Sequence, residues 1–396
     1  MLIDGWRRVP RGVVVLGFVS LLMDASSELV HALLPLFMVT VLGASTLVVG
    51  VIEGIAEATA MVVKVFSGYL SDLTRRRKPL VLLGYGLGAL SKLAFPLAPS
   101  LGWVVGARVA DRIGKGIRGA PRDALIADLA PADARGASFG LRQALDTVGA
   151  IAGPLLALGA MAWFAGDFRA AFWVAVLPAG LCVLLILLGV DEPAHAQAAQ
   201  PAARITLADL RRLDRRFVIV TGIAVLLTLA RFSEAFLVLR AQALGMPLAS
   251  VPWVMVAMTV VYAAVAFPAG VLADRGHTSR LIAGGLAALV AADLVLAQAS
   301  GAAGVVAGAG LWGLHLALTQ GLLSAMVAAV APAELRGTAF GVFNLACGVA
   351  LFVASALAGL LWDAIGPQAT FYAGAAFTLL AMAGLAWRRR DIPALR

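Results

Sequence analysis

The chain has 396 residues, of which 61% are hydrophobic and only 13% are charged. A soluble protein is typically about 45–50% apolar and about 25% charged, so this composition excludes an ordinary soluble protein and a disordered chain. The two cysteines exclude a disulfide scaffold, and we interpret the net charge of +9 as basic residues held on the cytoplasmic side of a membrane rather than as a nucleic-acid-binding surface.

Long apolar stretches follow one another along the chain, and each is long enough to cross a bilayer as an α-helix. The stretches are continuous, whereas the strands of a membrane barrel alternate apolar and polar residues over about ten positions. We therefore predict an all-α integral membrane protein with twelve transmembrane helices. The predicted spans are 12–42, 46–71, 79–98, 101–125, 137–164, 168–190, 217–244, 251–273, 281–299, 303–326, 338–362 and 367–387.

The basic residues are unevenly divided between the two sets of loops. Arg and Lys gather at 7–11, 75–78, 135, 204–216, 275–280, 336 and 388–396. The opposite loops, at 43–46, 98–101, 165–168, 245–250, 300–302 and 363–367, contain none. Because cytoplasmic loops are the basic ones, we expect both termini in the cytoplasm. The short loops suggest a bacterial inner (cytoplasmic) membrane.

The longest polar segment, 191–216, divides the predicted spans into two sets of six. Its first part is rich in Pro and Ala and predicts a flexible linker. Its second part forms either an amphipathic helix on the membrane surface, with arginines at the lipid headgroups, or a solvated connector helix. The predicted domains are an N-terminal six-helix bundle (1–190), a cytoplasmic linker with an amphipathic helix (191–216) and a C-terminal six-helix bundle (217–396).

Two segments of the first half recur in the second half at nearly the same offset. Residues 68–72 (GYLSD) align with 270–274 (GVLAD), and residues 131–140 align with 332–341. Each pair occupies the same place in its half, after the second span or before the fifth. A tandem duplication of a six-helix unit explains both matches. Parallel repeats of this kind place a substrate site between the halves, near the bilayer midplane.

These motifs resemble those of the major facilitator superfamily of transporters. Residues 68–80 are similar to the family signature between helices two and three, Gly-x-Leu-x-Asp followed by a basic cluster, except that Arg75 stands where Gly is usual. Residues 270–280 are a shorter second copy, and residues 112–116 are similar to the Arg-x-x-Gln-Gly pattern of helix four, with Lys in place of Gln. The resemblance implies two pseudo-symmetric six-helix bundles that work by alternating access.

The fifth span carries the glycine pattern of one part of that family. Gly140, Gly149, Gly153 and Pro154 reproduce the spacing Gly-x8-Gly-x3-Gly-Pro, and the closing Gly-Gly is half present, at Gly159. Glycines in a membrane helix let neighbouring helices approach closely and slide. The resemblance is to the exporting, antiporter branches.

The candidate gating residues belong to these loop and glycine motifs. Asp72 and Asp274 precede basic residues in short turns, where a carboxylate can pair with an arginine or with the positive N-terminus of a helix. Such a link can hold the cytoplasmic side shut, and a plain charged turn is the other interpretation. The gating set is Gly68, Asp72, Arg76, Arg77, Asp274, Arg275, Gly149, Gly153 and Pro154.

Many charged side chains lie inside the predicted spans, where each costs about 2.5–3.5 kcal/mol on insertion scales and needs a partner or a water-filled cavity. Their helical spacing puts Asp24, Glu28 and His31 on one face of the first span. The family resemblance implies that the first, fourth, seventh and tenth spans line the central cavity. The candidate proton-coupling and cavity residues are Asp24, Glu28, His31, Glu53, Glu57, Arg108, Asp111, Arg112, Lys115, Arg231, Glu234 and His315.

Other charges in the membrane have a structural interpretation. Arg142 and Asp146 are four residues apart and can pair on their own helix. Lys64 and Lys92 either snorkel to the interface or neutralise a neighbouring acid. Asp293 is alone in the ninth span and we interpret it as structural.

Asp24 or Glu28 could alternate between protonated and ionised forms as the cavity opens to each side, with Arg112 biasing the exchange. Acids in the first span with an arginine in the fourth also resemble the proton-coupled multidrug antiporters. We therefore expect a secondary active transporter that exports a small organic solute by proton antiport. The proton gradient is its energy source, and we expect no bound cofactor.

Other functions stay open. The basic residues of the fourth span suit an organic-anion or metabolite importer, since arginine offers paired donors to a carboxylate or phosphate. A metal-chelate carrier and a lipid flippase are further alternatives. We expect no enzyme, because the zinc-protease, nucleophile-elbow and phosphate-loop motifs are missing from the sequence. The expected partners are a small-molecule substrate, with an organic anion as one candidate, and membrane lipids. We expect no nucleic acid, no resident metal and a monomer.

Overall fold

The computed structural model describes residues 9–74, 76–131, 134–192, 214–331 and 336–388, and within these ranges the chain is helical, without a strand. Ten of the described helices are long and apolar enough to cross a membrane. Two shorter or more charged helices complete the set, so the prediction of an all-α protein with twelve spans is confirmed.

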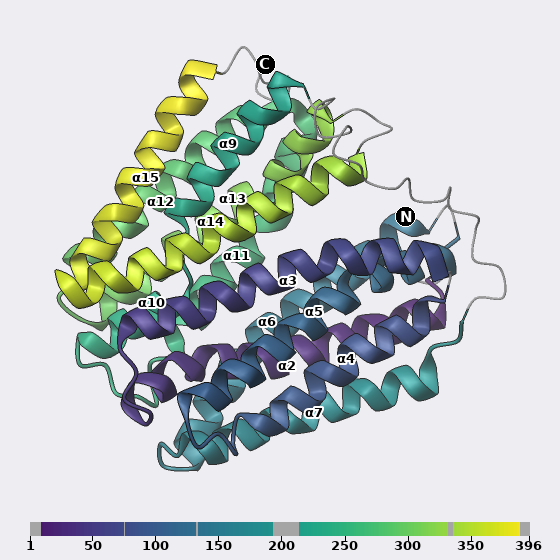
Figure 1. Ribbon diagram of the computed structural model, residues 1–396, viewed down its shortest axis with the longest axis horizontal. Coiled ribbons are helices and arrows are strands. Elements are labelled where there is room, and N and C mark those ends of the chain that lie inside the picture. Colours follow the sequence, from purple (N-terminus) through teal and green to yellow (C-terminus); the bar gives the residue numbers. More distant parts are fainter. Residues whose placement is uncertain (1–8, 75, 132–133, 193–213, 332–335, 389–396) are drawn as a thin grey trace. The chain divides into compact units, whose positions relative to one another are not determined.

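The first half supplies six long helices, labelled in Figure 1. They are α2 (Arg11–Thr40), α3 (Thr46–Thr74), α4 (Arg77–Ala94), α5 (Leu101–Leu129), α6 (Arg135–Trp163) and α7 (Phe168–Gly189). The two less apolar helices are α4, whose 18 residues include Arg77, Lys78 and Lys92, and α5, which carries the densest run of charges.

The second half supplies six spans built from more elements. They are α9 (Arg215–Ala230) with α10 (Ala235–Ala243), α11 (Trp253–Leu272), α12 (Thr278–Gln298) preceded by the π-helical turn η1 (Ala273–His277), α13 (Ala302–Val330), α14 (Arg336–Ala364) and α15 (Pro367–Arg388).

The seventh span is interrupted at residues 231–234, where α9 ends and α10 begins. A break frees backbone groups that a membrane cannot hydrate, so they need protein partners. The N–H of Ser233 donates to the hydroxyl of Ser355 on α14 at 3.1 Å, and the Ser233 hydroxyl accepts from the N–H of Ala235 at 3.3 Å. Serine side chains therefore replace the helical hydrogen bonds at this point.

The helices form two compact units. One comprises residues 1–37 and 59–203, and the other comprises residues 38–58 and 204–396, so α3 contributes to both. The domain boundaries expected from the sequence, at 190 and 217, stay predictions. The amphipathic helix predicted in the linker lies outside the described residues, which resume at Asp214.

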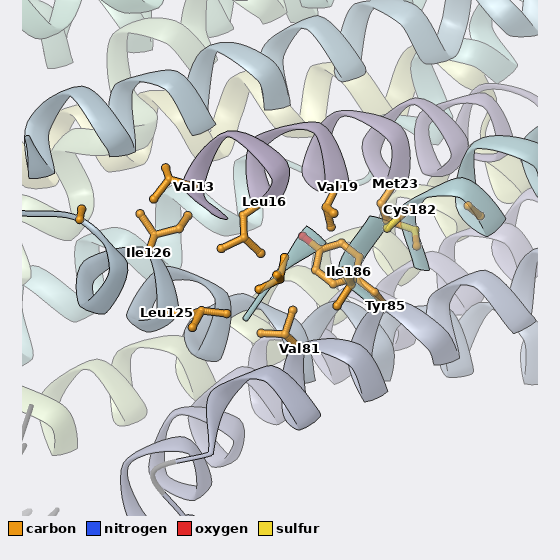
Figure 2. Packing of buried hydrophobic residues seen from close by; sticks show 13 residues of the cluster. Val13, Leu16, Val19, Met23, Val81, Tyr85, Leu125, Ile126, Cys182 and Ile186 are labelled. Carbon is orange, nitrogen blue, oxygen red and sulfur yellow. The ribbon is translucent and has the colours of Figure 1, made fainter. Parts of the chain in front are cut away.

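The core of the first unit lies where α2, α4, α5 and α7 meet. Its members are fully or almost fully buried and include Val13, Leu16, Val19, Met23, Val81, Tyr85, Leu125, Ile126, Cys182 and Ile186, shown in Figure 2. The hydroxyl of Tyr85 lies 3.1 Å from that of Ser20, so the one polar tip in this apolar cluster has a partner.

Helices α4 and α5 approach each other through glycines. A Cβ placed on Gly84 would lie 2.7 Å from the backbone N of Arg118 and 2.8 Å from the carbonyl oxygen of Gly114, and a Cβ on Gly114 would lie 2.7 Å from the carbonyl oxygen of Gly84. Such small residues are what lets two membrane helices come into backbone contact. This contact sets the height of α5 against α4, and with it the position of the charges that both helices carry.

We predict that Gly84→Ala destabilises the protein by about 1–3 kcal/mol, because its Cβ would push the backbones of α4 and α5 apart. Gly86→Ala is the matched control on the same helix, because a Cβ there meets no atom within 4 Å. Thermal unfolding of both variants, purified in detergent, measures the difference. Equal unfolding temperatures for the two variants would contradict the close α4–α5 contact.

Candidate functional site

Asp111 of α5 is the centre of a buried polar cluster in the first unit. Lys92 of α4 binds its Oδ1 at 2.6 Å, and the hydroxyl of Ser91 lies 3.4 Å from the same oxygen. Arg108 and Arg112 each approach its Oδ2 at 3.8 Å. One carboxylate thus faces three cations, and the side chains of Lys92 and Arg108 are fully buried, at 0% exposed. The prediction that Lys92 could neutralise a neighbouring acid is confirmed.

His31 joins this cluster from α2. Nη2 of Arg108 lies 2.9 Å from Nδ1 of His31. A guanidinium can only donate, so Nδ1 accepts and the imidazole is in the tautomer with its proton on Nε2. His31 therefore faces α5, although the sequence places it on the same face of α2 as Asp24 and Glu28.

A second cluster lies further along α5, toward its C-terminal end. Nη1 of Arg122 lies 3.5 Å from the hydroxyl of Tyr85, and its Nη2 lies 3.1 Å from Asp123. Arg142 of α6 lies 2.9 Å from Asp146 and 3.7 Å from Asp123. The predicted Arg142–Asp146 pair on one helix is confirmed, and it belongs to a network that also includes α5.

Asp24 and Glu28 are only partly buried on α2, unlike the residues around Asp111. The charges acting on Asp24 are those of Arg118, Arg122 and Lys115, together with Glu28. Arg112, the partner expected from the sequence, contacts Asp111 instead.

Sequence reasoning thus missed Arg118 and Arg122 as the basic residues beside the α2 acid. Arg118 lies over the ring of Tyr85, with its guanidinium carbon 4.8 Å from the ring centroid. Arg118 and Arg122 follow Lys115 at helical spacing on α5, and that spacing is the signal that could have found them.

The glycine motif of α6 packs directly on the acids of α2. A Cβ on Gly149 would lie 2.5 Å from the carbonyl oxygen of Leu21 and 3.1 Å from Cβ of Asp24. A Cβ on Gly153 would lie 2.5 Å from Cβ of Glu28. The glycines at 149 and 153 therefore bring the α6 backbone against the two turns of α2 that carry Asp24 and Glu28. A Cβ on Gly159 would meet nothing within 4 Å.

The loop motif after α3 connects three helix ends of the first unit. Arg77, at the start of α4, pairs with Asp128 at 2.5 Å and also donates to the carbonyl of Ala124, both on α5. Glu192, just after α7, accepts from the backbone N–H of Arg77 at 2.7 Å and of Lys78 at 2.9 Å. The carboxylate of Glu192 thus caps the positive N-terminus of α4.

The remaining predicted gating residues are less informative. Arg76 is exposed, a Cβ on Gly68 would meet only Ala120, and Pro154 is buried inside α6. Arg275 lies in η1, where Gly276 has φ +84°. The side chains of Asp72 and Asp274 lie outside the described part of the structure, so the predicted carboxylate gate stays a prediction.

The predicted site residues of the second unit lie on different elements. Arg231 and Glu234 flank the break between α9 and α10, and the charges of Glu234 and Arg231 act on each other. Arg231 also acts on His315 of α13, whose Nδ1 lies 2.8 Å from the carbonyl oxygen of Gly285. The structure therefore gathers Arg231, Glu234 and His315 around the break.

Glu53 and Glu57 belong to the part of α3 that joins the second unit, and Glu53 is fully buried. Across the described residues, no three His, Cys, Asp or Glu side chains are placed to hold a metal ion.

The comparisons with known proteins agree with this architecture. The profile of the Major Facilitator Superfamily matches residues 16–239 and 218–396. An uncharacterized MFS-type transporter of Methanocaldococcus jannaschii is 31% identical over 385 residues, which cover 94% of each chain. A protein of Mycobacterium tuberculosis is 31% identical over 363 residues, covering 89% of this chain and 87% of its own. The chain belongs to the major facilitator superfamily, and it is an integral membrane transporter.

Solved structures share the fold at low sequence identity. The nucleoside transporter NupG matches with a TM-score of 0.80 and 13% identity, over 94% of this chain and 99% of its own. A D-xylose–proton symporter matches with a TM-score of 0.74 and 18% identity, over 97% and 98%. The human organic anion transporter MFSD10 matches with a TM-score of 0.65 and 19% identity, over 95% and 99%. At these identities the likeness establishes the fold alone.

We predict that Asp111→Asn destabilises the protein more than Lys92→Met, because the first leaves three buried cations without their carboxylate and the second leaves Asp111 with two arginines. Breaking a buried pair from one side typically costs about 3–5 kcal/mol. The double variant should recover part of the loss. Thermal unfolding of the four proteins in detergent gives the coupling between the two sites. Losses that simply add would contradict the pairing of Lys92 with Asp111.

Proposed function

We propose that this transporter is a proton-coupled antiporter that exports a small organic solute by alternating access, with Asp24 and Glu28 as the exchanging acids. The observation that supports this most directly is the contact of the α6 glycine motif with α2. Gly149 and Gly153 pack against the turns that carry these two acids. The fitting context is a monomer in a bacterial inner membrane, with both termini in the cytoplasm.

The charges around Asp24 suggest how exchange works. Burial of the carboxyl and the neighbouring Glu28 favour the protonated form of Asp24, whereas the charges of Arg118, Arg122 and Lys115 favour its ionised form. Close approach of the basic residues favours release of the proton from Asp24. When α2 and α5 shift apart, or when the basic residues turn to a bound solute, the acid takes up a proton from water. The proton gradient then drives the cycle in one direction.

The α6 contact gives this exchange a mechanical link. Backbone contact through glycine lets α6 slide along α2 without side chains in the way. Asp146 of α6 also acts electrostatically on Asp24, and Arg122 and Arg142 balance Asp146. A shift of α6 against α2 therefore changes the charge around Asp24 at the point where the helices touch.

A second candidate is uptake of an organic anion by symport. The observation that favours it is the row of basic residues along α5, which includes Lys115 as an exposed side chain and Arg118 beside the partly buried acid. A carboxylate or phosphate on the solute would compete with Asp24 for these cations. A metal-chelate carrier is less well supported, because Nδ1 of His31 already faces the guanidinium of Arg108.

We predict that Asp24→Asn and Glu28→Gln each abolish solute-driven proton movement while the protein is still produced and folded. The measurement uses proteoliposomes with a pH-sensitive dye inside, challenged with a panel of organic acids, cationic drugs and metal chelates. Asp191→Asn is the control for the chemical change, because Asp191 is exposed beyond the end of α7. Antiport and symport move protons in opposite directions relative to the solute, so the sign selects between the two candidates.

If both acid variants keep full coupling, these acids are not the exchanging groups. If wild-type protein moves solute without protons, the transporter is not proton-coupled and the two acids are ligands of the solute or of the basic residues.

We predict that Gly153→Ala lowers the transport rate more than Gly159→Ala, both on α6. The Cβ at 153 would lie 2.5 Å from Cβ of Glu28, whereas the Cβ at 159 would meet nothing within 4 Å. Initial rates in the same proteoliposomes, with unfolding temperatures measured in parallel, test this. Equal rates would exclude a role of the α6–α2 contact in the cycle.

A further inference from the structure

Asp293 of α12 is a carboxyl group in an unusual position. It is 0% exposed, and neither of its oxygens has a hydrogen-bond partner among the described residues. By contrast, each acid on α5 has a basic partner, Lys92 for Asp111, Arg122 for Asp123 and Arg77 for Asp128.

The carboxyl of Asp293 lies near the ring of Phe232, which belongs to an aromatic cluster. A Cβ on Gly374 of α15 would lie 2.7 Å from Oδ2 of Asp293 and 3.0 Å from Cε1 of Phe232. Oδ2 of Asp293 and the ring of Phe232 therefore both lie beside Gly374, in the space that a side chain at this position would fill. The Phe232 ring lies 5.2 Å from that of Trp312 and 5.6 Å from that of Phe371, centroid to centroid.

The charged and titratable groups on the neighbouring elements do not bond Asp293. Arg240 of α10 donates to the carbonyl oxygens of Leu296, Ala297 and Ala299, at the C-terminal end of α12. His315 of α13 bonds Gly285.

On α15 the titratable side chain in the described part of the helix is Tyr372, which is 47% exposed. Arg231 and Glu234 lie on the break, on either side of Phe232 and Ser233. None of these groups bonds Asp293.

The internal duplication allows the surroundings of Asp293 to be compared with the aligned positions of the first unit. At the offset that aligns Pro131 with Pro332, Gly84 aligns with Gly285, and the packing agrees. Gly84 packs on Gly114 and Arg118, while Gly285 packs on the aligned residues His315 and Thr319.

At the same offset Lys92 aligns with Asp293, Asp111 with Trp312, and His31 with Phe232. The first unit has a paired polar cluster at this place, whereas the second unit has a single acid, at the position of the lysine, near aromatic rings.

An ionised carboxylate without a partner in an apolar interior costs several kcal/mol, so the group is held as the neutral acid. An acid that only filled space would be replaced without loss by an apolar or amide side chain. Asp293 also lies five residues before the end of α12 at Gln298, which is about 7–8 Å along the helix axis. This is the end that the basic-loop asymmetry assigns to the outside.

We propose that Asp293 is a second proton-binding site of the transport cycle, loaded from the outer side, and that Phe232 is its cover. On loading, a proton from water forms an O–H bond with the carboxylate. On release, that bond breaks and the proton returns to water, with no electron transfer. Because Phe232 lies on the helix break between Arg231 and Glu234, a solute that moves the break also moves the cover. This inference rests on the proton coupling proposed above.

The first test is infrared spectroscopy of the purified protein at neutral pH. Wild-type protein should show the carbonyl band of a protonated carboxyl group, and Asp293→Asn should lack that component. The substitution is nearly isosteric and neutral, so the fold should persist. Phe232→Ala should speed the deuterium shift of the band in heavy water. Identical bands in wild type and Asp293→Asn would overturn the proposal, whatever the transport result.

The second test uses the proteoliposome assay and the same solute panel. Asp293→Asn should lose solute-driven proton movement but keep exchange of labelled for unlabelled solute, since exchange needs no net proton release. Asp293→Glu should keep part of the proton movement, and Asp191→Asn should match wild type. Unchanged proton movement in Asp293→Asn overturns the proposal, and so does loss of exchange together with proton movement, which assigns Asp293 a structural role.

The two proposals fail separately. If no solute of the panel moves protons through wild-type protein, the antiport proposal fails, and the infrared band still decides whether Asp293 carries a proton. If wild-type protein is coupled and Asp293→Asn is equally coupled, the antiport proposal survives and the site at Asp293 does not.

Discussion

The ion cluster around Asp111 is the constraint on which the first unit depends. Helix α5 carries more charge than a bilayer tolerates on an isolated helix, and it is stable in the membrane only because its charges meet partners. Lys92 supplies one from α4, and His31 contacts Arg108 from α2. The glycine contact between α4 and α5 places Lys92 opposite Asp111. Packing and charge pairing thus select the same register of α4 against α5.

The fold could be predicted from the sequence because its cause is local. Twenty apolar residues in a row form a spanning helix wherever they occur, and the twelve predicted spans correspond to the described helices within a few residues. The break in the seventh span could not be predicted, because the stretch 217–244 contains neither Pro nor a centrally placed Gly. It depends on Ser355 of α14, which is 122 positions away along the chain.

The candidate site could be predicted only in part. Spacing along one helix places Asp24, Glu28 and His31 on one face, but it does not say which neighbouring helix each side chain meets. Consequently, the sequence pointed to Arg112 as the partner of Asp24, whereas Arg118, Arg122 and Lys115 act on it. Burial is equally invisible in a sequence, which therefore does not show that Asp293 is fully buried without a hydrogen-bond partner among the described residues.

The two repeats use charge in opposite ways although they descend from one six-helix unit. Where Lys92 and Asp111 pair, they fix two helices, and each charge stabilises the other. Where Asp293 and Trp312 occupy the aligned positions, the acid has no countercharge among the described residues, so its charge depends on whether water reaches it. An ion pair between two helices makes their contact rigid, whereas the charge of an acid without a countercharge changes with its access to water. With an acid at the position of Lys92 and an indole at that of Asp111, the second unit has no ion pair here, and on the proposal above its acid responds to a proton gradient.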